Sequence, residues 1–244
     1  MQMQAQDSTP VTAGKVARLW RYPVKSMLGQ PAEALEIVPG GVAGDRCLAV
    51  RDGGGRPASG KSMEGFARIQ NLLDFSAGSD GDTVCIRFPD GSEHRADDPE
   101  IDAALSEAIG QTVTLTTEDD GRHVDASPIH LLTEASLAWL RATLPEAVVD
   151  ERRFRPNLVL DVGGEGRVEQ DWVGRHLRIG AVELRITEET VRCGMVSMAH
   201  ADLPRDPRVL RHLTREAEMC LGVYADVVTP GPVALGDRVE LIDT

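Results

Sequence analysis

Cys193 is the residue of this sequence best suited to redox or metal chemistry. It stands between Arg192 and Gly194, directly after a predicted strand. A neighbouring arginine favours the thiolate form of a cysteine, which acts as a nucleophile or binds a soft metal ion. Gly194 leaves space beside the sulfur because it has no side chain. The alternative for a lone cysteine is a small buried hydrophobic residue, which we assign to Cys47 and Cys85 because both lie in apolar runs.

Two further segments place a basic group at the end of a predicted strand. Lys25 and Ser26 follow the apolar run that ends at Tyr22, where a turn can present an ammonium group and a hydroxyl to an oxyanion. Arg46 stands after Gly44-Asp45 at the entrance of another predicted strand. Taken alone, the first segment is also compatible with a solvated turn and the second with a surface salt bridge.

Two loops in the second half offer hydrogen-bond donors. Ser127 lies just before a predicted helix, in a loop whose hydroxyl and free amides suit an anion. Arg155 and Asn157 flank Pro156, which fixes the backbone between a guanidinium and an amide that together suit a polar ring or a phosphate. These residues could equally close a loop at a strand entrance.

Familiar catalytic patterns are missing from the sequence. The six histidines are scattered and form no His-x-x-x-His pair, and the four cysteines form no Cys-x-x-Cys pair. There is neither a Gly-x-Ser-x-Gly segment nor a Gly-x-Gly-x-x-Gly segment. If the chain is an enzyme, it therefore needs a cofactor with its own reactivity.

Short strands separated by turns must position these residues. In the first half the pattern predicts strands over Lys15–Tyr22, Ala34–Val38, Cys47–Arg51, Val84–Phe88 and Val113–Thr116, and a helix over Pro99–Ile109. In the second half it predicts strands over Leu158–Val162, His176–Thr187, Leu221–Val228 and Arg238–Ile242, with helices over Thr133–Leu144, where Thr133 is the N-cap, and around Pro207–Glu218. The irregular spacing argues against repeating βαβ units, and favours a mainly β chain with a few helices and barrel-like sheets.

The composition limits which kinds of partner and which cellular location we expect. The 39 acidic and 26 basic residues give a net charge of −13, which would repel nucleic acid unless basic groups gathered locally. A few converging arginines can still form a basic pocket for a small anion. No apolar run approaches the length that spans a bilayer and residues 1–12 are polar, so we expect no membrane partner, a cytoplasmic location and free thiols.

In chain order, the segments Tyr22–Ser26, Gly44–Arg46, Asp125–Pro128, Phe154–Asn157 and Arg192–Cys193 resemble the signature of MOSC-domain proteins that carry an N-terminal MOSC β-barrel. The closing stretch, with Gly222, Tyr224 and Gly236, also resembles the terminal strands of that family. The resemblance implies a tail over residues 1–13, a barrel-like N-terminal domain over 14–120, and a MOSC barrel domain over 121–244 packed on it.

The resemblance implies a molybdenum cofactor, a molybdenum ion held by the sulfurs of a molybdopterin. Cys193 would supply one protein thiolate to the metal. As in amidoxime-reducing relatives, the groups that would surround the pterin and its phosphate are Lys25, Ser26, Arg46, Ser127, Arg155, Asn157 and Arg192. The implied activity is an oxidoreductase that reduces small N-hydroxylated or N-oxide compounds. Its electrons would come from a separate ferredoxin-, flavodoxin- or cytochrome-type donor, because the cysteine spacing provides no iron-sulfur cluster.

One departure from the amidoxime reducers leaves a second function open. Those proteins carry an Asp-Pro-x-Thr-Gly type segment after the cysteine, whereas this chain reads Ser197-Met198-Ala199-His200 and onward. The alternative is a carrier protein, in which Cys193 bears a persulfide or the fold stores the cofactor without turnover. For the enzyme, His200 is a candidate proton donor because a histidine titrates in the right range. A surface histidine is the other interpretation of His200.

Overall fold

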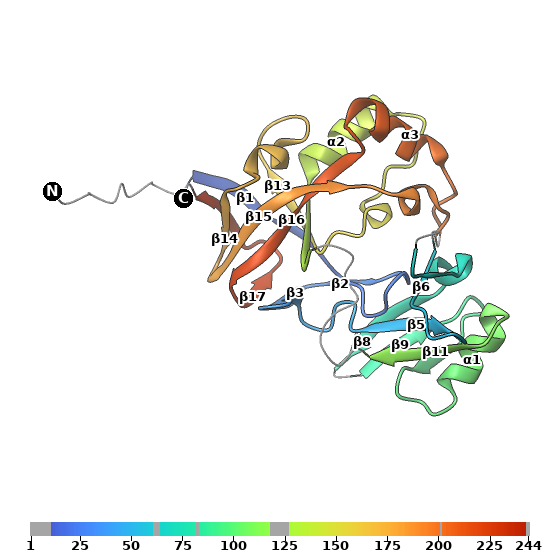
Figure 1. Cartoon of the computed structure of the whole chain (residues 1–244). Helices are drawn as coiled ribbons and strands as arrows, with labels where there is room; N and C mark the ends of the chain where they lie inside the picture. Colours follow the sequence, from blue (N-terminus) through green and yellow to red (C-terminus); the bar gives the residue numbers. More distant parts are fainter. Residues whose placement is uncertain (1–10, 61–63, 82, 118–126, 201, 243–244) are drawn as a thin grey trace.

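The computed structural model describes residues 11–60, 64–81, 83–117, 127–200 and 202–242. The expected fold class is confirmed, since the chain is mainly β and contains a closed barrel of seven strands. A larger part holds the barrel and two helices, and a smaller part holds short sheets and one helix (Figure 1).

The barrel runs in the order β13-β12-β16-β15-β14-β18-β1, and pairing of β1 with β13 closes it. Its strands are antiparallel except for the parallel pair of β12 and β13. The barrel strands are β1 (Val11–Arg21), β12 (Ile129–Thr133), β13 (Leu158–Val162), β14 (His176–Ile179), β15 (Val182–Val191), β16 (Cys220–Thr229) and β18 (Arg238–Ile242), and β2 (Gln30–Ala32) pairs outside β1. Alternating apolar side chains along β15 and β18 face the buried interior, so the period-2 pattern directly forms the barrel core.

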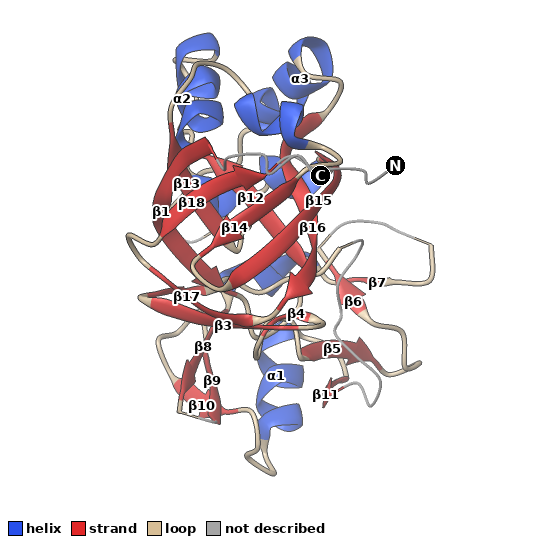
Figure 2. Ribbon diagram, turned by 90° about the vertical axis from the view of Figure 1, so that its left-hand side faces the viewer, coloured by secondary structure: helices blue, strands red, loops and turns tan. Residues whose placement is uncertain are grey.

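The barrel is flanked by helices at one end and by the smaller part at the other (Figure 2). Helices α2 (Glu134–Thr143) and α3 (Pro207–Glu216) bury Leu137, Leu140 and Leu213 in a second core against the barrel. The expected N-cap is confirmed, because the Thr133 hydroxyl accepts a hydrogen bond from the Ser136 amide at 3.1 Å.

The smaller part consists of short sheets around its own core, which includes Phe75, Ile86 and Leu105. Its elements are β5 (Leu48–Asp52), β6 (Ala58–Ser59), β7 (Ala67–Arg68), β8 (Ser76–Asp80), β9 (Thr83–Arg87), β10 (Glu93–Arg95), α1 (Ile101–Ile109) and β11 (Val113–Thr117). A three-stranded sheet of β3 (Ala34–Val38), β4 (Gly41–Val42) and β17 (Gly231–Ala234) lies between this part and the barrel (Figure 2). Four short 3-10 helices complete the described elements: η1 (Gln70–Asp74), η2 (Glu151–Arg153), η3 (Val168–Trp172) and η4 (Gly194–Ser197).

The larger and the smaller part are not consecutive segments of the chain. Strand β1 comes first in sequence yet closes the barrel, and β3 pairs with β17 from the end of the chain. Val16 and Ile37 accordingly lie in the barrel core, although both fall within the expected N-terminal domain of residues 14–120. The expected tail over residues 1–13 overlaps β1 from Val11 onward, and its first ten residues lie outside the described part.

Two local expectations differ from the structure. The single strand expected over His176–Thr187 is a hairpin, because Gly180 adopts φ +59 and reverses the chain between β14 and β15. Strand β12 was not expected, because all five of its residues are buried and the sequence shows no alternation there. Within the described residues, no helix is both long and apolar enough to cross a membrane.

Candidate functional site

Two arginines of the candidate site share one aromatic ring. The guanidinium carbons of Arg46 and Arg155 lie 5.0 and 4.3 Å from the centroid of the Tyr22 ring. The π face attracts each cation and partly offsets their mutual repulsion. Asp45 orders this cluster, since its carboxylate accepts hydrogen bonds from Arg46 Nη1 and, at 2.7 Å, from the Tyr22 amide. Residues far apart in sequence thereby form one basic cluster where β1 leaves the barrel.

His130 connects this cluster to Arg192. Its Nδ1 lies 3.3 Å from the Arg155 carbonyl oxygen, and its Nε2 lies 3.2 Å from Arg192 Nη1. A carbonyl only accepts and a guanidinium only donates, so Nδ1 carries the proton and Nε2 the lone pair. Burial and the charge of Arg192 hold the pKa of His130 well below its usual value, in agreement with this neutral form. We call Tyr22, Arg46, Arg155, Arg192 and His130 the arginine site.

Gly222 makes this connection possible. It adopts φ +82, and an added Cβ would lie 2.5 Å from the Leu131 carbonyl oxygen and 2.6 Å from His130 Nε2. Any side chain would displace the imidazole from Arg192, so glycine is required by space as well as by backbone conformation.

Arg192 is held at both ends of its guanidinium. Nη2 donates to the Phe154 carbonyl oxygen at 2.6 Å and Nη1 to His130, so both partners are neutral. Burial lowers the pKa of Arg192 from its ordinary value. No carboxylate of the described residues hydrogen bonds to Arg192, although a buried cation normally has a counterion.

Cys193 follows Arg192 at the end of β15 and is the residue directly before η4. Its side chain is partly exposed, and the described residues offer its sulfur no hydrogen bond. An added Cβ at Gly194 would meet no atom within 4 Å, so open space lies beside the thiol. The geometry leaves Cys193 accessible to a bound group next to the arginine site.

The segment with Lys25 and Ser26 adjoins this site through the next residue. The Met27 carbonyl oxygen accepts a hydrogen bond from Arg155 Nη1. Lys25 is 7% exposed and its Nζ lies 5.4 Å above the Phe66 ring, while its amide donates to the Leu48 carbonyl oxygen at 2.8 Å. Lys25 is thus a buried ammonium group, which differs from the solvated turn that the sequence alone allowed.

Backbone strain marks the same residues. Ser26, Arg46 and Arg155 adopt φ values of +65, +49 and +55, in the left-handed region that side chains disfavour. In the described chain only two other non-glycine residues do so, Glu218 and Met219, and the Met219 carbonyl oxygen accepts a hydrogen bond from the Arg192 amide at 2.8 Å. Such conformations cost about 1 kcal/mol or more each and cluster at binding sites.

Asn157 and Ser127 hold the barrel backbone together. The Asn157 carboxamide accepts from the His130 amide at 3.2 Å and donates to the Trp20 carbonyl oxygen at 3.4 Å. The Ser127 hydroxyl donates to the Ala225 carbonyl oxygen at 3.0 Å. The structure therefore places both at strand entrances, and their contact with a ligand stays a prediction. Asp125 and Ala126 of the same expected loop lie outside the described residues.

Some buried polar atoms of the arginine site have no hydrogen-bond partner among the described residues. They include the Tyr22 hydroxyl and Arg192 Nε. Leaving such a group unsatisfied costs about 1–3 kcal/mol, so an orphaned group often marks the place of a ligand or water. Inward guanidinium groups, orphaned donors and an accessible soft thiol suit a molybdopterin, which carries a phosphate, polar ring edges and a thiol-binding metal. The residues present fit that cofactor.

His200 is buried, and the expectation of a surface histidine is wrong. The residue is 3% exposed, and neither Nδ1 nor Nε2 has a hydrogen-bond partner in the described part of the chain. Burial, then the charges of Arg153 and Arg155, lowers the pKa of His200 to about 4. The ring is therefore neutral near pH 7, and it can donate or accept a hydrogen bond but is not a charged acid there.

Sequence reasoning missed Tyr22 and His130 as members of the site. Tyr22 was included in the Tyr22–Ser26 segment but not as a binding residue, and His130 was one of six scattered histidines. A partial signal existed, because each lies beside a segment already singled out. Their roles depend on contacts with residues more than 20 positions away, which no local pattern reveals.

Known proteins and one protein family resemble this chain in sequence. A model of the MOSC domain matches residues 118–240. The chain is 24% identical over 232 residues to a molybdenum cofactor sulfurase of Oryza sativa subsp. japonica, covering 74% of this chain and 28% of that protein. It is 29% identical over 139 residues to mitochondrial amidoxime-reducing component 1 of Mus musculus, covering 52% of this chain and 40% of that protein. The chain thus spans less than half the length of either relative.

One solved structure supports the fold. The YuaD protein from Bacillus subtilis superimposes with a TM-score of 0.53 at 15% identity, covering 96% of this chain and 97% of that one. At this identity the likeness concerns the fold alone.

Proposed function

Because this chain belongs to the MOSC domain family, we propose that it binds a molybdenum cofactor and reduces N-hydroxylated or N-oxide compounds. The observation that carries the proposal is the arginine site, where a buried guanidinium with only neutral partners adjoins an accessible thiol. An anionic cofactor supplies the counterion that Arg192 lacks, and a soft metal suits the sulfur of Cys193.

In this proposal the chain holds the cofactor through separate groups. Arg46, Arg155 and Arg192 bind the pterin and its phosphate, and Cys193 contributes a thiolate to the metal. Lys25 and Ser26 add an ammonium group and a hydroxyl, and Ser127 and Asn157 keep the strand entrances in place. When bound, the cofactor supplies a metal that changes oxidation state and can take oxygen from a substrate.

The proposed reaction consumes two electrons and two protons for each N–OH group, which becomes N–H while its oxygen leaves as water. The electrons come from a separate donor protein of the ferredoxin, flavodoxin or cytochrome type. His200 is neutral near pH 7, so it is not a charged acid for this reaction, and the protons come from solvent.

The similarity to a molybdenum cofactor sulfurase favours a second candidate function. In that case Cys193 carries a persulfide, or the chain stores the cofactor for another protein. Both versions use the same accessible thiol but need no electron donor.

One experiment separates the candidates. The protein is purified from a molybdenum-replete host, its metal and cyanide-labile sulfur are measured, and oxidation of reduced methyl viologen is followed with benzamidoxime as substrate. We expect one molybdenum per chain and amidoxime-dependent dye oxidation. Molybdenum without turnover would support a cofactor carrier, and labile sulfur without molybdenum would support a sulfur carrier.

A further inference from the structure

A groove of about 690 Å³ lies between the smaller part and the barrel part. One wall comes from Gly60, Arg68 and Asp74, and the other from η4 and α3. The groove reaches Gly194, the neighbour of Cys193, but contains no member of the arginine site. This volume is typical of pockets for molecules of drug or nucleotide size.

The groove combines apolar and cationic side chains. Met198, Pro207 and Leu210 offer apolar surface, whereas Arg205 and Arg211 offer guanidinium groups. Gly60 lets the thioethers come close, because an added Cβ would lie 3.1 Å from Met195 Sδ and 3.4 Å from Met198 Cε.

Arg205 and Arg211 differ from their neighbours in charge pairing. Arg208 binds the Asp206 carboxylate at 2.7 Å, and Arg152 binds Asp150 and Asp202 at 2.8 Å. Neither Arg205 nor Arg211 makes a hydrogen bond or ion pair with the described residues. The groove lining contains three arginines, Arg68, Arg205 and Arg211, but one carboxylate, Asp74, although the whole chain has a net charge of −13.

We propose that this groove binds the substrate, and that the substrate carries an anionic group, a carboxylate or a phosphate, which Arg205 and Arg211 recognise. This inference rests on the proposed reductase function and names its substrate class. The apolar side chains contact the carbon skeleton, and the opening at Gly194 admits the N-hydroxylated end toward Cys193. A charge-assisted hydrogen bond contributes about 1.5–3 kcal/mol, so loss of the anion contacts weakens binding by roughly 10- to 100-fold.

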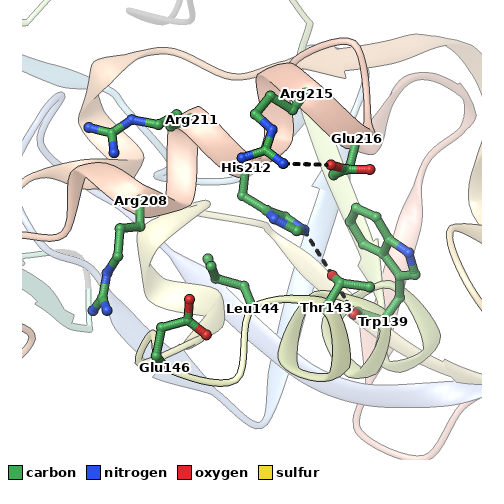
Figure 3. A pocket seen from close by; sticks show the side chains of 9 residues that line it. All are labelled: Trp139, Thr143, Leu144, Glu146, Arg208, Arg211, His212, Arg215 and Glu216. Atoms are coloured by element: carbon green, nitrogen blue, oxygen red, sulfur yellow. Dashed lines mark hydrogen bonds and ion pairs between the residues drawn. The ribbon is translucent and has the colours of Figure 1, made fainter.

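Helix α3 also provides a matched control. A second hollow lies between α2 and α3 (Figure 3), and Arg211 lines both this hollow and the groove, whereas Arg215 lines the hollow alone. There Arg215 lies 3.5 Å from Glu216, and His212 Nε2 lies 2.9 Å from the Thr143 hydroxyl. Arg215→Gln removes the same charge from the same helix outside the groove.

The test uses three probes with one skeleton: benzamidoxime, 4-carboxybenzamidoxime and 4-(phosphonomethyl)benzamidoxime. Binding to the cofactor-loaded protein is measured by calorimetry, and KM and kcat are measured with reduced methyl viologen. We expect at least one anionic probe to bind roughly tenfold or more tightly than benzamidoxime. The tighter of the two anionic probes identifies the carboxylate or the phosphate class.

Arg205→Gln with Arg211→Gln should abolish that preference while leaving benzamidoxime binding within about twofold, and Arg215→Gln should preserve it. Equal binding of all three probes, or an equal loss in the Arg215→Gln control, would overturn the inference. If no probe is reduced, the reductase function fails, but calorimetry still decides whether the groove binds anions.

Discussion

Two buried polar regions of this molecule differ in how completely their groups are paired. At the start of α2, Glu169 is 0% exposed, and each of its carboxylate oxygens accepts a hydrogen bond at 2.6 Å, one from Thr133 and one from Ser136. In the arginine site, the Tyr22 hydroxyl and Arg192 Nε have no hydrogen-bond partner within the described ranges. The first region satisfies itself and fixes α2 and η3 on the barrel. The second leaves buried polar atoms unpaired among the described residues.

The completeness of hydrogen bonding distinguishes a structural polar region from a candidate binding site better than burial does. Both regions contain an ionisable side chain in the interior, and burial shifts the pKa of each toward the neutral form, upward for Glu169 and downward for Arg192. They differ in whether every polar atom has a hydrogen-bond partner. Full pairing stabilises the native chain, whereas incomplete pairing together with strained backbone at Arg46 and Arg155 indicates a site shaped for something else. Substitutions at Glu169 should therefore lower the free energy of unfolding, whereas substitutions in the arginine site should lower cofactor retention.

The largest effect should follow from Cys193→Ser, which replaces a soft sulfur by a hard hydroxyl of similar size. We expect dye-linked reductase activity to fall by at least about a hundredfold, or roughly 3 kcal/mol of transition-state stabilisation. The pterin content should change little, because the arginines still bind it. Cys85→Ser is the control and should keep activity. Full turnover with an unchanged molybdenum spectrum in Cys193→Ser would refute the ligand assignment.

Glu169→Leu should remove both hydrogen bonds of the Glu169 carboxylate. It leaves the Thr133 and Ser136 hydroxyls without their acceptor, at a cost of about 1–3 kcal/mol for each unsatisfied group. We expect the free energy of unfolding in urea to fall by about 2–4 kcal/mol, with an unchanged molybdenum content in the folded protein. The exposed Glu165→Leu is the matched control. Selective loss of cofactor from a variant of normal stability would contradict the division into two regions.

Arg192→Gln should affect the unpaired region instead. The amide is too short to reach both His130 and Phe154 and carries no charge for the cofactor phosphate. We expect cofactor retention during dialysis to weaken by roughly 10- to 100-fold, since hydrogen bonds to charged groups contribute about 1.5–3 kcal/mol. Stability of the cofactor-free protein should change less than in Glu169→Leu. The exposed Arg178→Gln serves as control, and equal retention in both variants would remove Arg192 from the site.

The effect of His200 should be absent near neutral pH and should appear only on acidification. Its pKa of about 4 in the folded state lies below its ordinary value of 6.5, so the unfolded chain binds more protons between these values. This contribution to stability is present above pH 6.5 and is lost as the pH falls toward 4. At about 1.4 kcal/mol per pKa unit, the loss reaches up to about 3 kcal/mol. His200→Gln and His200→Phe should both flatten urea stability across this range, and a profile like that of wild type would show that His200 titrates normally.

The sequence by itself predicted most elements and singled out Cys193 as the candidate thiol. A short apolar run defined β13, and alternating apolar residues defined β18, both to the residue. The capping hydroxyl of Thr133 defined the start of α2, because these signals are local. The motifs around Arg46, Arg155 and Cys193 were visible for the same reason, since each is a short segment of distinctive residues.

Only the tertiary structure decided how these segments meet. Closure of the barrel by β1, the neutral bridge of His130 and the burial of His200 all depend on partners distant in sequence. Whether a polar group is paired or orphaned is a property of its three-dimensional surroundings, because the same residue type can satisfy itself in one place and await a ligand in another. The sequence specifies the type of each side chain, but the neighbours of that side chain in the folded protein decide what it contributes to stability or binding.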